Sequence, residues 1–189
     1  GSTTAATGST NGVGTNSRFY RPWGIDIFVD GSFALVADYS NNQIRKIIIS
    51  TRGVSLLAGG STGNANGFGT SAKFNGPRGI DISPDGIFAI IGDWGNNQIR
   101  RIRLSIAEVT LLAGSSTGST NGIGTNTKFY YPEGVSISSD NLYALVADYW
   151  NNQIRKIILS TAEVSLLAGG GLGGGIGGIS SGNSNGVGT

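Results

Sequence analysis

The sequence contains no cysteine, no histidine and no methionine among its 189 residues. Without cysteine, the chain has no disulfide framework and no thiolate nucleophile, and the redox state of its compartment stays open. Without histidine, it lacks the side chain best suited to proton transfer near neutral pH. These absences count against an enzyme that works through cysteine or histidine, and we predict no catalytic residue and no cofactor.

Long apolar runs are also missing, since no stretch of about 18 apolar residues indicates a membrane span. No basic segment followed by an apolar core indicates a signal peptide. Gly1-Ser2 resembles a cloning remnant, which favours a natural start elsewhere. The net charge of +2, from 13 basic and 11 acidic residues, is too balanced to indicate a nucleic-acid partner. We expect no membrane partner, and the localisation stays unknown.

Glycine, by contrast, is abundant, and its 33 copies recur at fixed places. The motif Asn-Gly-x-Gly-Thr begins at Asn11, Asn66, Asn121 and Asn185. The first two intervals are 55 residues each, and the third is 64 because a glycine-rich insertion lies around residues 171–178. Self-similarity at a fixed period indicates a repeat architecture rather than a disordered chain.

Each repeat contains four short segments rich in Ile, Val, Leu and Phe, which strands favour. In the first repeat they span Gly24–Val29, Phe33–Asp38, Gln43–Ser50 and Val54–Ala58. The pair Asn41-Asn42 between the second and third segments suits a turn, because asparagine tolerates the left-handed backbone region. Four antiparallel strands per repeat, arranged radially, predict an all-β chain that forms a β-propeller.

Three signatures recur in every repeat. They are Pro-x-Gly before the first strand, Ala-Asp or Gly-Asp at the end of the second, and Asn-Asn-x-Ile-Arg at the start of the third. These segments resemble NHL repeats over nearly the whole chain, although the long connections between blades depart from the family pattern. The resemblance implies four-stranded antiparallel blades, usually six to a ring, in a non-enzymatic scaffold that binds proteins or other ligands. Some NHL propellers bind RNA, which leaves an RNA-binding propeller as an alternative function.

The chain is long enough for three blades, which is half of such a ring. Three blades leave two sheet faces bare, and contiguous apolar surface of that size is not left in water. We therefore predict a homodimer in which two chains close head to tail into six blades. A fragment of a longer propeller, or an engineered half, stays open as an alternative. The expected segments are a lead-in loop 1–23, blade 1 at 24–58, a loop 59–78, blade 2 at 79–113, a loop 114–133, blade 3 at 134–168 and a glycine-rich tail 169–189.

In this topology the inter-blade loops share one face, the top face, with the loops between the second and third strands. Aromatic residues gather there and suit recognition of a sugar or a peptide. Positions 23, 78 and 133 are equivalent in successive blades but carry Trp, Arg and Glu, a mixture suited to specific recognition. Drift at exposed positions and covering of the loops beneath stay open as interpretations. The predicted binding residues for a peptide, protein or glycan ligand are Trp23, Arg78, Glu133, Tyr39, Trp94 and Trp150.

Asp26 and Asp81 lie on the first, innermost strands, where the third blade carries Ser136. An oxygen-rich ring of this kind is suited to a hard cation such as Ca²⁺. A metal-dependent hydrolase or lyase built on these two carboxylates is the alternative enzymatic function. Because the usual Ca²⁺ spacing signature is missing, we favour polar residues that face a water-filled channel, and we predict no metal site.

Most of the basic charge lies along strands rather than on the top face. We expect these side chains to pair with nearby aspartates or to lie along apolar neighbours, not to bind nucleic acid. Asp38, Asp93 and Asp148 each precede an Asn-Asn turn, where we expect them to accept backbone N–H bonds rather than to catalyse. The third-strand basic residues are Arg45, Lys46, Arg100, Arg101, Arg103, Arg155 and Lys156.

One phenylalanine stands at the start of each repeat, three residues before a proline. A large apolar side chain at the same place in every blade predicts an anchor between blades, formed by Phe19, Phe74 and Phe129. The glycine-rich segment Gly170–Gly178 is predicted to be the most mobile part of the chain, because glycine loses the most backbone entropy on ordering.

Overall fold

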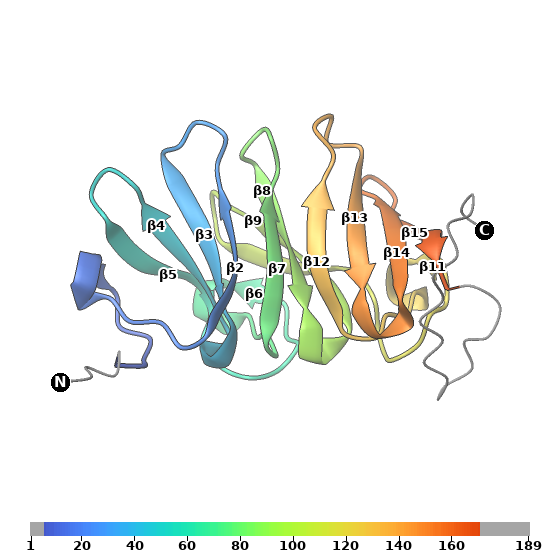
Figure 1. Ribbon diagram of the computed structural model, residues 1–189, viewed down its shortest axis with the longest axis horizontal. Coiled ribbons are helices and arrows are strands. Elements are labelled where there is room, and N and C mark those ends of the chain that lie inside the picture. Colours follow the sequence, from blue (N-terminus) through green and yellow to red (C-terminus); the bar gives the residue numbers. More distant parts are fainter. Residues whose placement is uncertain (1–5, 171–189) are drawn as a thin grey trace.

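The computed structural model describes residues 6–170, and this part of the chain is all-β (Figure 1). Three antiparallel sheets stand side by side, one for each sequence repeat. No helix within the described residues is long and apolar enough to cross a membrane. The prediction of high mobility for the glycine-rich segment concerns residues that lie, apart from Gly170, outside the described part.

The first sheet, blade 1, contains five strands in the order β1-β5-β4-β3-β2. The four long strands are β2 (Pro22–Ile27), β3 (Phe33–Asp38), β4 (Gln43–Ile48) and β5 (Gly53–Gly59), and they form a simple antiparallel meander. The fifth strand, β1 (Gly12–Val13), pairs with the outer edge of β5. Within this sheet β2 is therefore the innermost strand and β1 the outermost.

The second and third sheets repeat this arrangement and are called blade 2 and blade 3. Their inner edges are β7 and β12, and their outer edges are β6 and β11. Their strands are β6 (Gly67–Phe68), β7 (Pro77–Ile82), β8 (Phe88–Asp93), β9 (Gln98–Arg103), β10 (Glu108–Ala113), β11 (Gly122–Ile123), β12 (Pro132–Ile137), β13 (Tyr143–Asp148), β14 (Gln153–Ile158) and β15 (Glu163–Gly169).

The expectation of four strands per blade is wrong, because every blade has a fifth, outermost strand. This strand has only two residues and comes from the Asn-Gly-x-Gly-Thr segment that we expected to be loop. In blade 1, Gly12 lies opposite Val54 and Val13 opposite Gly53. Two residues cannot produce a detectable alternation of apolar and polar side chains, so the sequence pattern carried no strand signal there.

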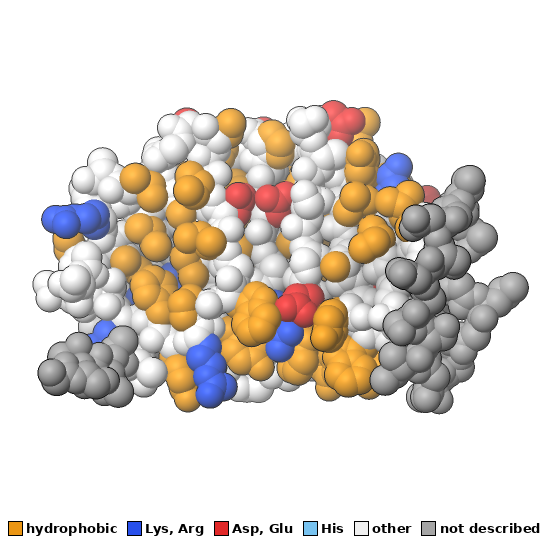
Figure 2. Space-filling view, in the orientation of Figure 1, with side chains coloured by type: hydrophobic (Ala, Val, Ile, Leu, Met, Phe, Trp, Pro, Cys, Tyr) orange, Lys and Arg blue, Asp and Glu red, His pale blue; other side chains and the backbone are white. Residues whose placement is uncertain are grey.

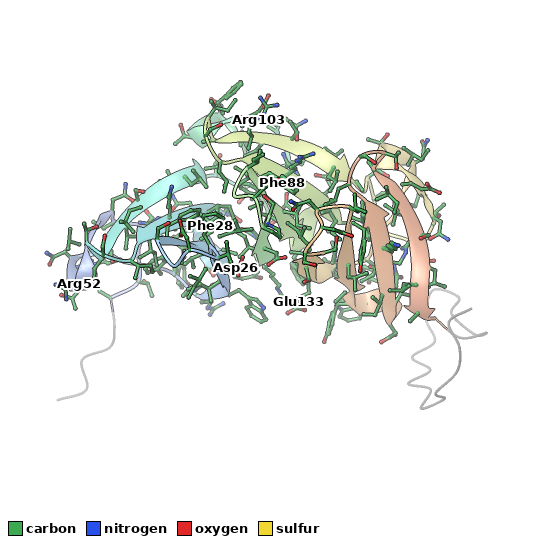
Figure 3. The ribbon with its side chains drawn as sticks, turned by 90° about the horizontal axis from the view of Figure 1, so that it is seen from above. Asp26, Phe28, Arg52, Phe88, Arg103 and Glu133 are labelled. Atoms are coloured by element: carbon green, nitrogen blue, oxygen red, sulfur yellow. The ribbon has the colours of Figure 1, made fainter. Side chains whose placement is uncertain are left out.

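The inner strands lie next to one another, with β7 between β2 and β12, and the sheets open outwards from them like a fan (Figure 1, Figure 3). Glycine in the Pro-x-Gly motif allows this close approach. A Cβ atom on Gly79 would stand only 2.1 Å from the carbonyl oxygen of Glu133 in the next blade. The motif is therefore required by the distance between neighbouring inner strands, because real Cβ contacts are never that short.

The apolar core lies between blades rather than within one sheet. The seam between blades 1 and 2, the first seam, buries Leu35, Ile44 and Ile91 around Phe74. The second seam, between blades 2 and 3, is centred in the same way on Phe129. Both phenylalanines are fully buried, which confirms the prediction that they anchor one blade to the next.

A 3₁₀ turn ends the second long strand of each blade and turns the chain into the third. The asparagines that follow these turns, Asn42, Asn97 and Asn152, have φ values of 54°, 55° and 53°. They adopt the left-handed conformation predicted for the second residue of each Asn-Asn pair. The three turns, η2 (Tyr39–Asn41), η4 (Trp94–Asn96) and η6 (Tyr149–Asn151), all lie on the same face of the molecule.

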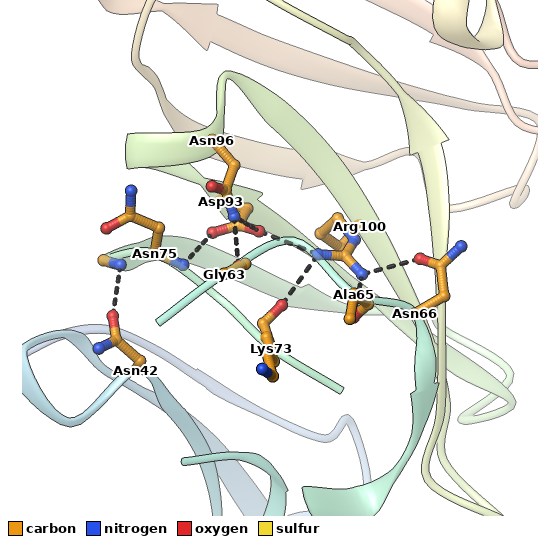
Figure 4. Close-up of polar contacts among 10 residues, drawn as sticks. Asn42, Gly63, Ala65, Asn66, Lys73, Asn75, Asp93, Asn96 and Arg100 are labelled. Carbon is orange, nitrogen blue, oxygen red and sulfur yellow. Dashed lines mark hydrogen bonds and ion pairs between the residues drawn. The ribbon is translucent and has the colours of Figure 1, made fainter. Parts of the chain in front are cut away.

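A buried ion pair ties each of these turns to the inter-blade segment (Figure 4). In blade 2, Arg100 Nη1 lies 3.1 Å from Asp93 Oδ2, and both side chains are fully buried. Arg100 Nη2 donates to Asn66 Oδ1 at 2.8 Å, so the third strand is joined to the Asn-Gly-x-Gly-Thr motif. Asp93 Oδ1 accepts the backbone N–H of Asn75. Burial raises the pKa of Asp93 to about 6, against the opposing effect of these donors.

The same pair is repeated in the other two blades, as Arg45 with Asp38 and Arg155 with Asp148. In each blade the aspartate also accepts a backbone N–H from the segment before the first long strand. These contacts confirm the structural role predicted for the aspartates and the pairing predicted for these arginines. They also show why the motifs recur: Asp, Arg and the motif asparagine form one network per blade.

Candidate functional site

The top face carries η2, η4 and η6 together with the starts of β2, β7 and β12, and it lies along the lower edge of Figure 1. All six residues predicted to bind a ligand belong to these elements. Strands β2, β7 and β12 start side by side, so positions 23, 78 and 133 follow one another along this edge. Figure 2 shows hydrophobic side chains gathered there around a basic and an acidic group.

Arg78 is the centre of this surface, and aromatic rings enclose its guanidinium. The guanidinium carbon lies 4.3 Å from the ring centroid of Trp23 and 4.2 Å from that of Trp94. The ring of Tyr39 lies 5.3 Å away. These distances are within the range of cation–π attraction, and the side chain of Arg78 is only 14% exposed.

Glu133 completes the surroundings of Arg78, with Oε2 at 3.1 Å from Nη1. The three equivalent positions therefore form a row of side chains in contact, in which Arg78 touches Trp23 on one side and Glu133 on the other. This contact supplies a structural reason for their divergence between blades, because an aromatic ring, a cation and an anion are complementary neighbours. Neither charge is left free, so the surface around Arg78 is aromatic rather than charged in character.

A second aromatic group extends the surface over blade 3. The ring of Tyr131 stacks on that of Trp94 with centroids 4.1 Å apart, and Tyr131 meets Trp150 edge-on at 6.1 Å. Tyr149 and Trp150 remain 57% and 52% exposed. Tyr131 was not among the predicted site residues, although it differs from its equivalents in the other blades, Arg21 and Gly76. The stacking on Trp94 makes it a part of the same surface.

Backbone amides of the next blade occupy one carboxylate oxygen of Asp26 and one of Asp81. Asp26 Oδ2 accepts the N–H of Ile82, and Asp81 Oδ2 accepts the N–H of Ile137. Burial raises the pKa of Asp81 to about 6, opposed by the Ile137 amide and assisted by the nearby Asp26. Within residues 6–170, no three acidic, histidine or cysteine residues cluster in a way that could hold a metal ion.

Three of the remaining third-strand cations lie on aromatic rings of the neighbouring strand, whereas Arg103 is exposed and pairs with Glu108. Lys46 Nζ is 4.2 Å from the ring of Phe33, and the guanidinium of Arg101 is 4.0 Å from that of Phe88. Lys156 stands over its own neighbouring ring in the same way, at 4.4 Å. Together with the three buried Asp–Arg pairs, these contacts agree with the expectation that strand cations pair locally. They do not form a basic patch on the top face.

No protein-family model matches the sequence. The chain is 28% identical over 163 residues to NHL repeat-containing protein 2 of Homo sapiens. It is 29% identical over 159 residues to Protein SUPPRESSOR OF QUENCHING 1, chloroplastic, of Arabidopsis thaliana. Each match covers 79% of this chain but only 22% and 15% of those proteins, so the chain spans less than a quarter of either.

Solved structures show the same fold. An auxiliary nutrient binding protein from Bacteroides thetaiotaomicron superposes with a TM-score of 0.63 at 20% sequence identity, covering 75% of this chain and 36% of that one. Hydrazine synthase from Kuenenia stuttgartiensis superposes with a TM-score of 0.55 at 19% identity, covering 77% and 34%. At such identities the likeness establishes the architecture alone, and one architecture here serves both a binding protein and an enzyme.

Proposed function

We propose that this chain, an array of three NHL-type β-propeller blades, is a non-enzymatic scaffold with two roles. It assembles with further blades of the same kind, and it binds a ligand through its top face. The observation that carries the binding role is the continuous aromatic surface along that face. Its two ends, at Trp23 and at Tyr149 with Trp150, expose about half of each side chain. Exposed aromatic groups of this size are characteristic of binding surfaces.

The internal pairing of Arg78 with Glu133 decides which contacts remain for a ligand. Their charges neutralise each other at 3.1 Å, so recognition falls to the rings rather than to a free charge. Aromatic rings with polar edges suit a ligand that has flat apolar faces and hydroxyl or amide groups, such as a sugar or an extended peptide. Trp150 is 52% exposed at the blade 3 end of this surface, so we place the main contact there.

A glycan array and a peptide array, probed with the labelled chain, test the binding role and separate the two ligand classes. Trp150→Ala should weaken binding to the selected ligand by about 10-fold or more, as expected for loss of a central aromatic contact. Leu142→Ala is the matched control, because Leu142 is 64% exposed in the β12–β13 hairpin, at the opposite face. Equal loss in both variants, or none in either with the fold intact, would place the ligand elsewhere.

The assembling role is supported by bare apolar surface on the first blade, where Ile25 and Ile27 of β2 are 62% and 57% exposed. Contiguous apolar surface of this extent marks an interaction site, and blades of the same kind offer the complementary surface. The mass of the chain in solution, measured by light scattering, tests this role without reference to the ligand. We expect a mass above the 19.3 kDa of one chain, and a stable monomer at micromolar concentration would remove self-assembly from the proposed function.

A further inference from the structure

The surface that blade 2 buries in the first seam is left uncovered on the outward face of blade 1 by the residues that the structure describes. Ile25 and Ile27 on β2 are 62% and 57% exposed. Ile80 and Ile82, at the same positions of blade 2, are 6% exposed because they pack against blade 1. Hydrophobic side chains accordingly gather over the blade 1 end of the molecule in Figure 2. We call this surface the blade 1 face.

Among the described residues, none covers the complementary surface on blade 3. A cavity of about 220 Å³ opens there. Ile154 in its lining is 38% exposed, whereas Ile44, at the same position of blade 1, is fully buried around Phe74. We call this cavity the blade 3 socket; its lining includes Ala147, Tyr149, Asn152, Ile154, Ala168 and Gly169.

In both internal seams the equivalent socket is filled by a phenylalanine of the following blade. A Cβ atom on Gly59 would stand 2.9 Å from Cδ2 of Phe74, and one on Gly114 would stand 3.0 Å from Cδ2 of Phe129. The third glycine of this series is Gly169, in the blade 3 socket. Within residues 6–170, Phe19, the first phenylalanine of the series, fills no such socket and is only half-buried.

Polar contacts fix the same register across both internal seams. Asn97 Oδ1 accepts the backbone N–H of Tyr131 at 2.8 Å, and its Nδ2 donates to Thr117 Oγ1 at 3.2 Å. Asn42 repeats these two contacts in the first seam. Asn152, the third asparagine, lies in the lining of the blade 3 socket. By the repeat spacing, its counterparts across a seam are Arg21 and Thr7.

We propose that a second copy of this chain docks its blade 1 face on blade 3, with Phe19 in the blade 3 socket and the backbone of Arg21 on Asn152. This inference rests on the assembling role proposed above and assigns it a surface, an orientation and a register. Each copy carries one blade 1 face and one blade 3 socket, so two copies satisfy each other through two identical head-to-tail seams. The partner is therefore this chain itself, and the assembly closes with six blades.

Arg21 gives the new seam a contact that neither internal seam has. Its φ of 51° matches the 54° of Tyr131, so the two residues have the same left-handed backbone at equivalent positions. Tyr131 lies on the ring of Trp94 across the second seam. The corresponding ring of blade 3 belongs to Tyr149, which is 57% exposed. In the dimer the guanidinium of Arg21 lies over this ring, a cation–π pair that favours the seam between copies.

Because the chain lacks cysteine, single introduced thiols report the seam without background. Two variants, Thr7→Cys and Asn152→Cys, are prepared separately and treated with a short thiol-to-thiol crosslinker, alone and mixed. The head-to-tail seam predicts covalent dimers in the mixture and none in either variant alone. The internal pair Asn97→Cys with Thr117→Cys, whose native side chains touch at 3.2 Å, is the positive control and should crosslink within one chain.

Light scattering of the untreated chain distinguishes failure of the proposed seam from failure of the assembling role itself. A mass of two chains together with crosslinking in the mixture alone supports the seam. A mass above one chain with no crosslink in the mixture, while the internal control reacts, overturns this seam but leaves the assembling role. A monomer overturns both, and a mass beyond two chains overturns the six-bladed closure.

A substitution in the socket contact supplies a second measurement. Phe19→Ala should raise the dissociation constant of the dimer by about 30-fold or more, as for a buried aromatic anchor. Arg21→Ala should raise it by a smaller factor, because one exposed cation–π pair is lost. The circular dichroism spectrum should stay that of the parent chain. An unchanged dissociation constant for Phe19→Ala overturns the placement of Phe19 in the socket.

Discussion

The ring of Phe74 lies directly against Gly59 of the preceding blade, with 2.9 Å between its Cδ2 and the place where a Cβ on Gly59 would stand. The same Cβ would stand 2.3 Å from the carbonyl oxygen of Asn42. Gly59 also has a φ of 90°, which side-chain-bearing residues rarely adopt. The glycine that ends β5 and the phenylalanine before β7 are thus two halves of one contact, and this contact sets how closely neighbouring blades pack.

Phe74→Ala should lower the free energy of unfolding by about 3–5 kcal/mol, because a fully buried aromatic side chain is lost from the first seam and leaves a cavity. Urea denaturation followed by circular dichroism measures the change. Phe68→Ala is the control within the same blade, since Phe68 is 57% exposed and its loss should change the free energy little. Equal effects of the two substitutions would contradict the anchoring role of Phe74.

Arg100→Met should destabilise the chain by about 3–5 kcal/mol, because it leaves the buried carboxylate of Asp93 without its cation. It also removes the donor to the carbonyl oxygens of Lys73 and Ala65, so the segment before β7 loses its attachment. Thermal unfolding and urea denaturation both report this loss. Arg103→Met is the surface control: Arg103 is 59% exposed and pairs with Glu108, and its loss should cost less than about 1 kcal/mol.

The repeat period and the turn chemistry were sufficient to predict the blades and several of their internal contacts. A phenylalanine recurring three residues before a proline was predicted to be an anchor, and Phe74 and Phe129 are fully buried. The aspartate before each Asn-Asn turn was predicted to accept backbone N–H bonds, and Asp93 does so from Asn75. Such predictions succeed because one residue type must satisfy the same local geometry in every blade.

Contacts between equivalent positions of different blades could not be predicted in the same way. Trp23 and Arg78 are 55 residues apart, and only the packing of adjacent inner strands brings their side chains within 4.3 Å. The sequence therefore shows that these equivalent positions carry different residues, but it does not show the contact that explains the difference. The two-residue outer strands were missed for a different reason, since β1 is defined by its pairing with β5 and has no pattern of its own.

Asp81→Asn should make the chain less sensitive to pH. Burial raises the pKa of the folded carboxyl to about 6, above the ordinary value of about 3.9 in the unfolded chain. The folded state therefore holds this proton more tightly, and its contribution to stability is complete below about pH 4 and lost as pH rises through about 6. Relative to the parent chain, the variant should gain stability between pH 4 and pH 7, because asparagine does not ionise at this buried position. Its side-chain oxygen can still accept the Ile137 amide.

The control for this titration is Asp85→Asn, for which the opposite sign is expected. The hydroxyl of Ser83 donates to Asp85 and lowers the pKa of its carboxyl, so the charged form favours the folded state. Its contribution is present above the unfolded pKa of about 3.9 and is lost as pH falls. Urea midpoints at pH 4 and pH 7 compare the two variants. Parallel pH profiles for both would refute the assignment of opposite shifts.

Arg78→Ala should disturb the aromatic surface more than it disturbs the fold. Removing the guanidinium leaves the facing rings of Trp23 and Trp94 without the cation that lies 4.3 and 4.2 Å from them, and leaves Glu133 without its partner. Water should then reach both indoles, so tryptophan emission should shift to longer wavelength. We expect a loss of about 1–2 kcal/mol in the free energy of unfolding, as for a partly buried cation–π contact.

Arg78→Lys distinguishes the geometry of the contact from its charge. Lysine keeps the positive charge but lacks the flat guanidinium that can lie between two rings and still reach a carboxylate. It should therefore restore part of the stability but not the parent emission spectrum. Arg52→Ala, which removes an exposed cation at the far end of blade 1 (Figure 3), should change neither. If Arg78→Lys instead restores the parent emission spectrum completely, the positive charge alone stabilises these contacts. The flat packing of the guanidinium between Trp23 and Trp94 is then not required.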